Sequence, residues 1–267
     1  MTSSLEPSQI ETEIQQAFEA FMTPSKNSPS DAERTLLEKA ASFSVPLKST
    51  DIRGLSWGAG PTVLLVHGWG GYGLQLGSFV EPLVEAGYQV VTFDAPAHGS
   101  TAGAQTNGLE MTRALKTVAQ QQAPITSIIA HSLGAASTTL ALSEGLQLQK
   151  VVYIAAMCWL SNAVVTFARR ARLSTDVENG LRRQFEARLG KDIWQRFAID
   201  QNASNLNIPA LLFHDQSDRD VAIEESKAIA QAWSGARLIE TSGLRHRRIL
   251  RNESVIQQTV DFISLST

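Results

Sequence analysis

The stretch IIAHSLGAAS, residues 128–137, places the hydroxyl of Ser132 between a run of apolar residues and a run of small ones. The residues before it are apolar along their length and predict a buried strand, whereas LGAASTTLAL after it predicts a helix. Ser132 is therefore expected in a tight turn from strand to helix. Such a turn needs small residues two positions before and two positions after the serine, and these are Ala130 and Gly134.

Other runs along the chain predict the remaining strands of the sheet. Two short β-prone runs, SFSVPL and IRGLSWG, predict an antiparallel entry to the sheet, and helical stretches separate the later runs. This alternation predicts an α/β fold with a doubly wound, mostly parallel sheet, whose functional groups gather at the carboxyl ends of the strands. The runs that are apolar throughout, as strands covered on both faces are, are TVLLVHG, QVVTFDAP, SIIAHS, KVVYIAA and PALLFHD.

Two helical regions flank or interrupt this alternation. Residues 1–41 form a predicted N-terminal helical segment, because Ile10, Ile14, Phe18 and Phe21 recur at helical spacing and a second helix begins near Ser30. We expect this helical pair to pack on the main body, with a lid or a partner-binding arm as the alternative. Residues 42–267 form the main domain, and the helical pattern at about 158–207 is too long for a simple crossover. It predicts an inserted helical cap.

Composition narrows the class of protein. The chain of 267 residues is 43% hydrophobic and 18% charged, with a net charge of −3 and no long basic stripe, so we expect a folded globular protein that does not bind nucleic acid. The single cysteine, Cys158, excludes an intrachain disulfide framework. The first residues lack the pattern of a signal peptide, and no run of 18 apolar residues occurs. We therefore expect a cytoplasmic protein without a membrane segment, and we predict no particular oligomeric state.

The strand, turn and helix around Ser132 resemble the nucleophile elbow of the α/β-hydrolase family, which is usually written G-x-S-x-G. Ala130 stands in place of the first glycine, a replacement that the family accepts. The resemblance extends from about Ser42 to the end of the chain. It implies a serine nucleophile, an acid and a histidine in that order along the sequence.

A serine hydroxyl needs a base within hydrogen-bond reach, and the base needs an orienting group. His246, in TSGLRHRRIL after the expected last strand, resembles the family's catalytic histidine. For the acid, LLFHDQSDRDV ends a strand and offers three aspartates. We predict Asp218, which matches the family's usual position, and keep Asp215 and Asp220 as alternatives that would otherwise shape the turn.

The loop HGWGGYG, residues 67–73, resembles the family's oxyanion loop. The resemblance implies that the backbone amides of Trp69 and Leu133 form the oxyanion hole, and that His67 holds the loop in shape. In FDAPAHGST, Asp94 and Gly99 resemble residues that shape a neighbouring turn. A phosphate cradle is the weaker interpretation of the glycines, because neither G-x-G-x-x-G in a dinucleotide context nor a Gly-Lys-Ser ending is present.

The aromatic residues Trp69, Tyr72 and Trp159, with Phe167 and Trp194 of the expected cap, are candidates for the walls of a substrate pocket, although such side chains more often belong to a core. The predicted reaction is cleavage of a small-molecule carboxylic ester by two-step acyl transfer to water. It requires no cofactor, and no two of the five histidines show the close helical spacing of a zinc motif. The alternatives are a thioesterase or aminopeptidase-type hydrolase of the same fold, or a ligand-binding protein that keeps the fold without turnover.

Overall fold

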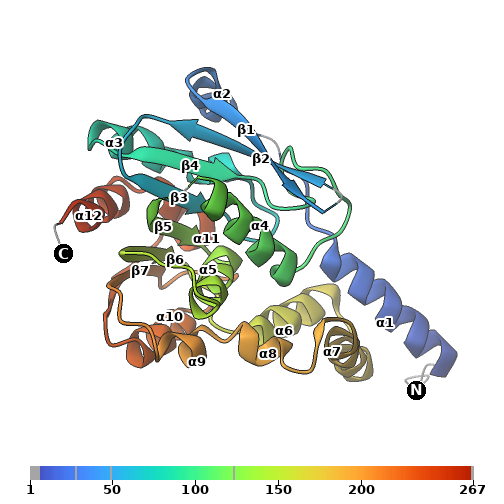
Figure 1. Cartoon of the computed structure of the whole chain (residues 1–267). Coiled ribbons are helices and arrows are strands. Elements are labelled where there is room, and N and C mark those ends of the chain that lie inside the picture. Colours follow the sequence, from blue (N-terminus) through green and yellow to red (C-terminus); the bar gives the residue numbers. More distant parts are fainter. Residues whose placement is uncertain (1–6, 28, 49, 123, 266–267) are drawn as a thin grey trace.

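A single eight-stranded sheet organises the chain (Figure 1). The computed structural model describes residues 7–265 apart from residues 28, 49 and 123. The strands lie in the order β1-β2-β4-β3-β5-β6-β7-β8. The first two pair antiparallel with each other, β2 pairs antiparallel with β4, and all other pairs are parallel. The strand bounds are β1 Ala41–Leu47, β2 Thr50–Trp57, β3 Thr62–Val66, β4 Gln89–Phe93, β5 Ile125–His131, β6 Lys150–Ile154, β7 Ala210–Asp215 and β8 Ala236–Thr241.

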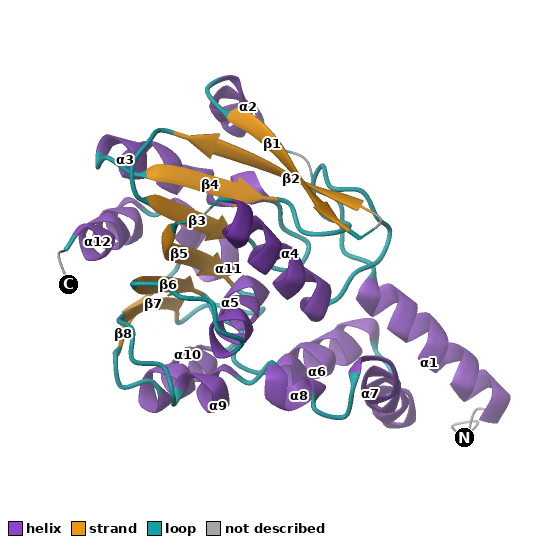
Figure 2. Cartoon of the chain, viewed as in Figure 1, coloured by secondary structure: helices purple, strands orange, loops and turns teal. Residues whose placement is uncertain are grey.

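Helices cover both faces of the sheet (Figure 2), and successive residues of each strand point to opposite faces. On β6, Val151 and Tyr153 pack into the cluster on one face, whereas Val152 and Ile154 pack into the cluster on the other. The predicted fold class is confirmed. The first face is covered mainly by α4 Gly108–Gln121, α5 Leu133–Ser143 and α10 Ile223–Ala232, and the second by the 3₁₀ segment Gly73–Phe79, α3 Val80–Glu85 and α12 Glu253–Ser264.

Four helices lie between β6 and β7. They are α6 Leu160–Ala171, α7 Thr175–Leu189, α8 Ile193–Arg196 and α9 Ile199–Ala203. Buried residues of α8 and α9 belong to the main core, as does Leu160 at the start of α6, whereas Val164 of α6 and the buried apolar residues of α7 pack into a separate small cluster. We call α6 and α7 the cap helices. A short helix, α11 Arg245–Arg248, follows β8.

The two N-terminal helices separate instead of forming the expected pair. The first, α1 Pro7–Met22, packs its apolar stripe against α7 of the cap, and Figure 1 shows it beside the cap helices. The second, α2 Asp31–Glu38, begins with a capping box between Ser30 and Glu33 and packs Leu36 against the apolar cluster on the second face of the sheet. Each helix therefore follows its own apolar face. None of the helices that the structure describes is long and apolar enough to cross a membrane.

Candidate active site

Ser132 occupies the turn between β5 and α5 in a backbone conformation that is rare for a side-chain-bearing residue, with φ 53° and ψ −120°. Such a conformation costs about 1–3 kcal/mol and persists only where the surroundings impose it. Three main-chain hydrogen bonds do so here. The Ser132 amide donates to Ile154 O at 3.1 Å, and the Ser132 carbonyl accepts from the amides of Ala135 at 3.1 Å and Met157 at 3.3 Å.

Small residues around the turn allow backbones to approach one another. A Cβ atom on Gly134 would lie 2.6 Å from the carbonyl oxygen of His67 and 2.7 Å from that of Val66. A Cβ atom on Gly68 would lie 2.8 Å from Cβ of Ser132. The serine turn and the loop after β3 therefore pack main chain against main chain, which fixes their relative positions.

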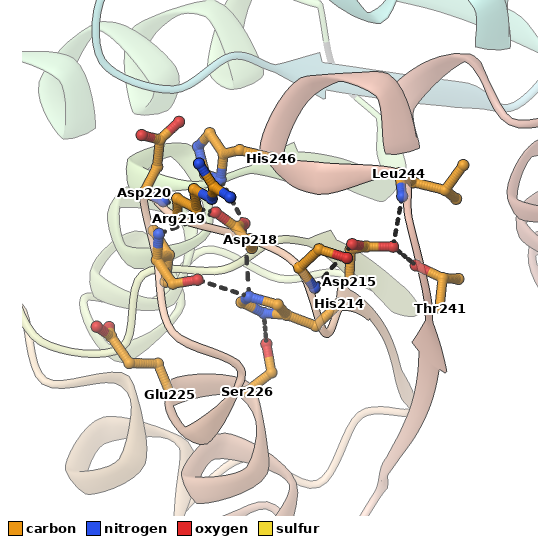
Figure 3. A network of polar contacts seen from close by, with 12 residues as sticks. His214, Asp215, Asp218, Arg219, Asp220, Glu225, Ser226, Thr241, Leu244 and His246 are labelled. Atoms are coloured by element: carbon orange, nitrogen blue, oxygen red, sulfur yellow. Dashed lines mark hydrogen bonds and ion pairs between the residues drawn. The ribbon is translucent and has the colours of Figure 1, made fainter.

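The structure brings Asp218 and His246 together, although 28 residues separate them in the sequence (Figure 3). Nδ1 of His246 lies 2.7 Å from Oδ2 of Asp218. The aspartate side chain is fully buried, and its Oδ1 accepts hydrogen bonds from the amides of Asp220 at 2.8 Å and Val221 at 3.1 Å. Nδ1 of His246 donates this hydrogen bond and the carboxylate oxygen accepts it, so in a neutral imidazole Nε2 is the nitrogen that can accept.

A second histidine packs against this acid. His214 Nε2 donates to Val221 O at 3.0 Å and lies 3.5 Å from Asp218 Oδ2, while its Nδ1 accepts from Ser226 Oγ at 2.7 Å (Figure 3). Burial lowers the pKa of His214. His214 is therefore a neutral support for Asp218, a role that no pattern in the sequence predicted.

The two alternative aspartates have other partners. Asp215 accepts from the amide of Ser217 and, through its other oxygen, from Thr241 Oγ1 at 2.9 Å and the Leu244 amide at 2.8 Å. Burial raises the pKa of Asp215, but these hydrogen bonds outweigh it and lower the pKa to about 2. Asp215 thus ties the end of β7 to the loop that carries His246. Asp220 is exposed and pairs with Arg170.

The ligand atoms of Asp218, Asp220 and His246 lie within 4.8 Å of one another, a spacing that a metal ion could bridge. The groups are already committed, however, because Asp218 bonds His246 and two amides, and Asp220 bonds Arg170. The arrangement fits an oriented base better than a cation site.

His131 links the serine turn to His246. Its Nε2 lies 2.9 Å from the carbonyl oxygen of His246, and the two rings lie 4.6 Å apart between centroids. Because a carbonyl only accepts, Nε2 of His131 carries the proton. Burial, and then the neighbouring His246, lower the pKa of His131 well below its usual range. The residue beside the serine is thus a neutral donor that holds the main chain of His246.

The loop after β3 is held by two neutral histidines. His67 Nδ1 donates to Gly68 O at 2.7 Å, and its Nε2 accepts from the Ala95 amide at 3.0 Å. His98 Nδ1 donates to Pro96 O at 2.9 Å, and its Nε2 accepts from the Gly70 amide at 3.0 Å. Burial lowers the pKa of His67, and burial followed by the neighbouring His67 lowers that of His98 to about 3.

Trp69 follows Gly68, which packs closely on Cβ of Ser132, and Leu133 follows Ser132 directly; all three of Trp69, Ser132 and Leu133 line one cavity. Among the described residues the Trp69 amide has no acceptor, and the Leu133 amide, at the first position of α5, has none within its helix. The turn after β4 supports this loop, because Asp94 accepts from the Gly73 amide at 2.7 Å and from the Ser100 amide at 2.7 Å. The residues that line the cavity with Ser132 therefore include two whose main-chain amides have no acceptor of these kinds.

A cavity of about 430 Å³ opens at this point, and Ser132 and His246 both line it. The predicted wall residues Trp69 and Phe167 contribute to its walls. Gln75, Arg247 and the α1 residue Phe21 also line it, although the sequence did not identify these three as wall residues. The apolar spacing of α1 predicted only that Phe21 would be buried. We call this space the Ser132 cavity.

Three predicted wall residues lie elsewhere. Tyr72 does not line the Ser132 cavity, since its hydroxyl donates to Glu33 Oε2 at 2.8 Å beside α2. Trp159 packs against the main core and donates from Nε1 to Asp200 Oδ1 at 3.1 Å. Trp194, named with them, is also outside the cavity and bonds Glu186. Each ring follows its own polar partner away from the serine.

Comparison with known proteins agrees with the fold. Residues 63–253 match the model of the alpha/beta hydrolase family, so the chain belongs to that family. An esterase from Pyrococcus furiosus has a similar structure, with a TM-score of 0.69 and 18% identity over 90% of this chain and 98% of its own. An esterase from Exiguobacterium antarcticum gives 0.65 and 16% over 84% and 100%, and a thioesterase domain from the curacin biosynthetic pathway gives 0.62 and 17% over 85% and 99%. No curated protein sequence matches the chain.

Replacing Gly134 with alanine should destabilise the fold. Alanine is the better helix former by about 1 kcal/mol, so any loss reflects the clash with the two carbonyl oxygens of β3 and its loop. We expect Gly134→Ala to lower the free energy of unfolding by about 1–3 kcal/mol in urea denaturation. Gly77→Ala is the matched control, because its Cβ would meet only the end of the Leu36 side chain. Equal stability of the two variants would contradict the close approach.

The buried neutral histidines should make the fold sensitive to mild acid. Above about pH 6.5 they are neutral in both the folded and the unfolded state. As the pH falls below that value, the unfolded chain takes up protons that the folded chain excludes, so the free energy of unfolding decreases. For His98, whose folded pKa is about 3, the decrease approaches about 1.4 kcal/mol per pH unit.

Urea denaturation of the wild type and of His98→Asn between pH 5 and 6.5 tests this expectation. Asparagine keeps a donor for the carbonyl oxygen of Pro96 but does not titrate. The variant should show a shallower pH dependence by about one proton. Identical slopes would show that His98 takes up its proton in the folded state.

Proposed function

We propose that this chain is a serine hydrolase that cleaves a small-molecule carboxylic ester through an acyl-enzyme intermediate. The observation that carries the proposal is the 2.7 Å contact between Asp218 and His246 at the wall of the cavity that Ser132 also lines. An oriented imidazole, a serine in a strained turn and free amides on one cavity are the parts that acyl transfer needs.

In the first half of the reaction, Ser132 Oγ attacks the ester carbonyl carbon while Nε2 of His246 takes the hydroxyl proton. Asp218 keeps the imidazole in the required tautomer and stabilises the imidazolium. The amides of Trp69 and Leu133 donate to the developing oxyanion. The intermediate then collapses, the bond to the alcohol oxygen breaks, and His246 returns its proton to the departing alcohol.

In the second half, water attacks the acyl-serine carbonyl and gives a proton to Nε2 of His246. Collapse of this intermediate returns the proton to Ser132 Oγ and releases the carboxylic acid.

The same site favours an ester over a peptide with a free amine. The carboxylate of Asp220, which could bind an ammonium group at the cavity, is already paired with Arg170.

A fluorophosphonate should label Ser132 with loss of fluoride. We expect intact-mass analysis and peptide mapping to show one phosphonyl adduct, absent from Ser132→Ala and formed much more slowly by His246→Ala. Ser137→Ala is the matched control, because Ser137 lies on α5, the helix that follows Ser132, is fully buried and does not line the cavity. It should label as the wild type does.

Two results would sink the proposal. One is no adduct on the folded wild type at high probe concentration, together with no hydrolysis of p-nitrophenyl esters. The other is an adduct that persists in Ser132→Ala. Preferred turnover of a thioester or a p-nitroanilide over the ester with the same acyl group would instead move the substrate to the alternative hydrolase classes.

The contact between His131 and His246 predicts a positioning effect. His131→Phe removes the donor to the His246 carbonyl, so the base should lose its fixed position, while a ring remains at this position of the cavity wall. We expect kcat for a p-nitrophenyl ester to fall by about 10- to 100-fold, with little change in KM. His131→Gln, which can still donate, should recover most of the loss. Equal rates for both variants would exclude this role.

A further inference from the structure

We propose that the N-terminal segment, residues 7–27, completes the cap, and that Phe21 sets the length of the aliphatic acyl group that the site accepts. The inference rests on the proposed ester hydrolysis, and it assigns the acyl half of the substrate. It also gives α1 a function in recognition, beyond that of packing.

The helix α1 is built into the cap. Gly180 of α7 lies so close to it that a Cβ atom there would be 2.1 Å from Cδ1 of Ile14. Polar contacts add to this packing, since Gln15 Oε1 accepts from Gln184 at 2.5 Å and from Arg188 at 3.2 Å. The buried apolar residues shared by α1 and the cap helices are Ile14, Ala17, Phe18, Met22, Val164, Val177, Leu181 and Phe185.

The same segment then runs along the proposed oxyanion loop. Asn27 Nδ2 donates to Gly70 O at 2.7 Å. Ser25 packs closely on the same residue, because a Cβ atom on Gly70 would lie 2.7 Å from Ser25 Oγ. The carbonyl of Met22 accepts from the Thr106 amide at 2.9 Å. Residues 7–27 are therefore held at one end by the cap and at the other by the loop that carries Trp69.

Phe21 lies between these two attachments and lines the Ser132 cavity. Its ring centroid is 6.3 Å from that of Trp69, 5.2 Å from that of Phe167 and 5.0 Å from that of Phe185, with edge-to-face packing on the two cap rings. The ring thus bridges the oxyanion loop and the cap. A change in its size alters the cavity without touching Ser132, His246 or Asp218.

The polarity of the cavity indicates which part of the substrate meets this wall. His246 must protonate the departing alcohol, so the alcohol lies on its side, where the charged residues Arg170, Asp220 and Arg247 also line the cavity. The acyl group then extends toward Trp69 and Phe21. The apolar residues that line the cavity from the cap and the main core are Met157, Leu160, Phe167, Phe185, Leu189 and Ile193. Such a surface suits an unbranched or branched aliphatic chain.

The test compares kcat/KM for p-nitrophenyl esters from butanoate to dodecanoate. Phe21→Ala should raise the ratio of kcat/KM for the long ester to kcat/KM for the short ester by at least about tenfold. One methylene group in an apolar pocket already changes specificity by about this factor, and the substitution removes several carbon atoms from the wall. Phe21→Trp should move the preference toward short esters. Phe18→Leu is the control: it lies one turn away on α1, packs against Phe185 and does not line the cavity. It should keep the wild-type profile.

Calorimetric binding of straight-chain carboxylates of the same lengths separates this inference from the proposed reaction. The Phe21 variants should shift the chain-length dependence of Kd in the same directions whether or not esters turn over. If the wild type neither reacts with the fluorophosphonate nor hydrolyses the esters, but the Phe21 variants shift the chain-length dependence of Kd, the proposed reaction is wrong and the acyl site stands. If chain-length profiles of Phe21→Ala and Phe21→Trp both coincide with the wild type, the inference is overturned.

Discussion

The close packing of the Ser132 turn on the loop after β3 is the constraint on which the site depends. Gly68 and Gly134 let two main-chain segments meet where side chains would collide, and hydrogen bonds from β6 and its loop hold Ser132 at a positive φ. The same contact brings the segments that carry Trp69 and Leu133 to one cavity with Ser132. Hydrogen bonds from the sheet thus compensate the backbone strain at Ser132, and the strained turn orients the neighbouring main-chain amides.

Around this turn the chain uses histidine in two different ways. His67, His98, His131 and His214 are buried, and burial lowers the pKa of each, so they act as neutral groups with one donor and one acceptor nitrogen. They hold, in turn, the loop after β3, the main chain of His246 and the carboxylate of Asp218. Among the described residues, His131 and His246 both line the cavity, but only His246 places Nδ1 on a carboxylate there. The neighbouring histidines are engaged in holding the main chain or Asp218, which leaves His246 as the candidate base of the proposed reaction.

The sequence was informative where function follows from chain order and local pattern. Apolar runs predicted the parallel strands, and the short residues around Ser132 predicted the turn. The distance from Asp218 to His246 leaves room for α10 and β8, which the structure places there. The directions of aromatic side chains were not predictable in this way. Tyr72 and Trp159 follow partners on α2 and α9, and those partners are brought near only by the tertiary fold.

The N-terminal helix shows the same limit. Its stripe of Ile14, Phe18 and Phe21 indicates a buried face, but periodicity does not say which surface covers it. In the folded chain that surface is the inserted cap, which lies more than 130 residues away along the sequence. The site is therefore assembled from three distant parts of the chain. The part nearest the N-terminus contributes a cavity wall that no local sequence motif indicates.

The central claim is that Ser132 and His246 act as one catalytic unit. The most direct measurement is kcat/KM on one activated ester for Ser132→Ala, His246→Ala and the double variant. Residues of one unit are strongly non-additive, so the double variant should be no slower than the slower single variant. If instead the two losses multiply, serine and histidine contribute independently, and the account of a histidine-activated serine is wrong.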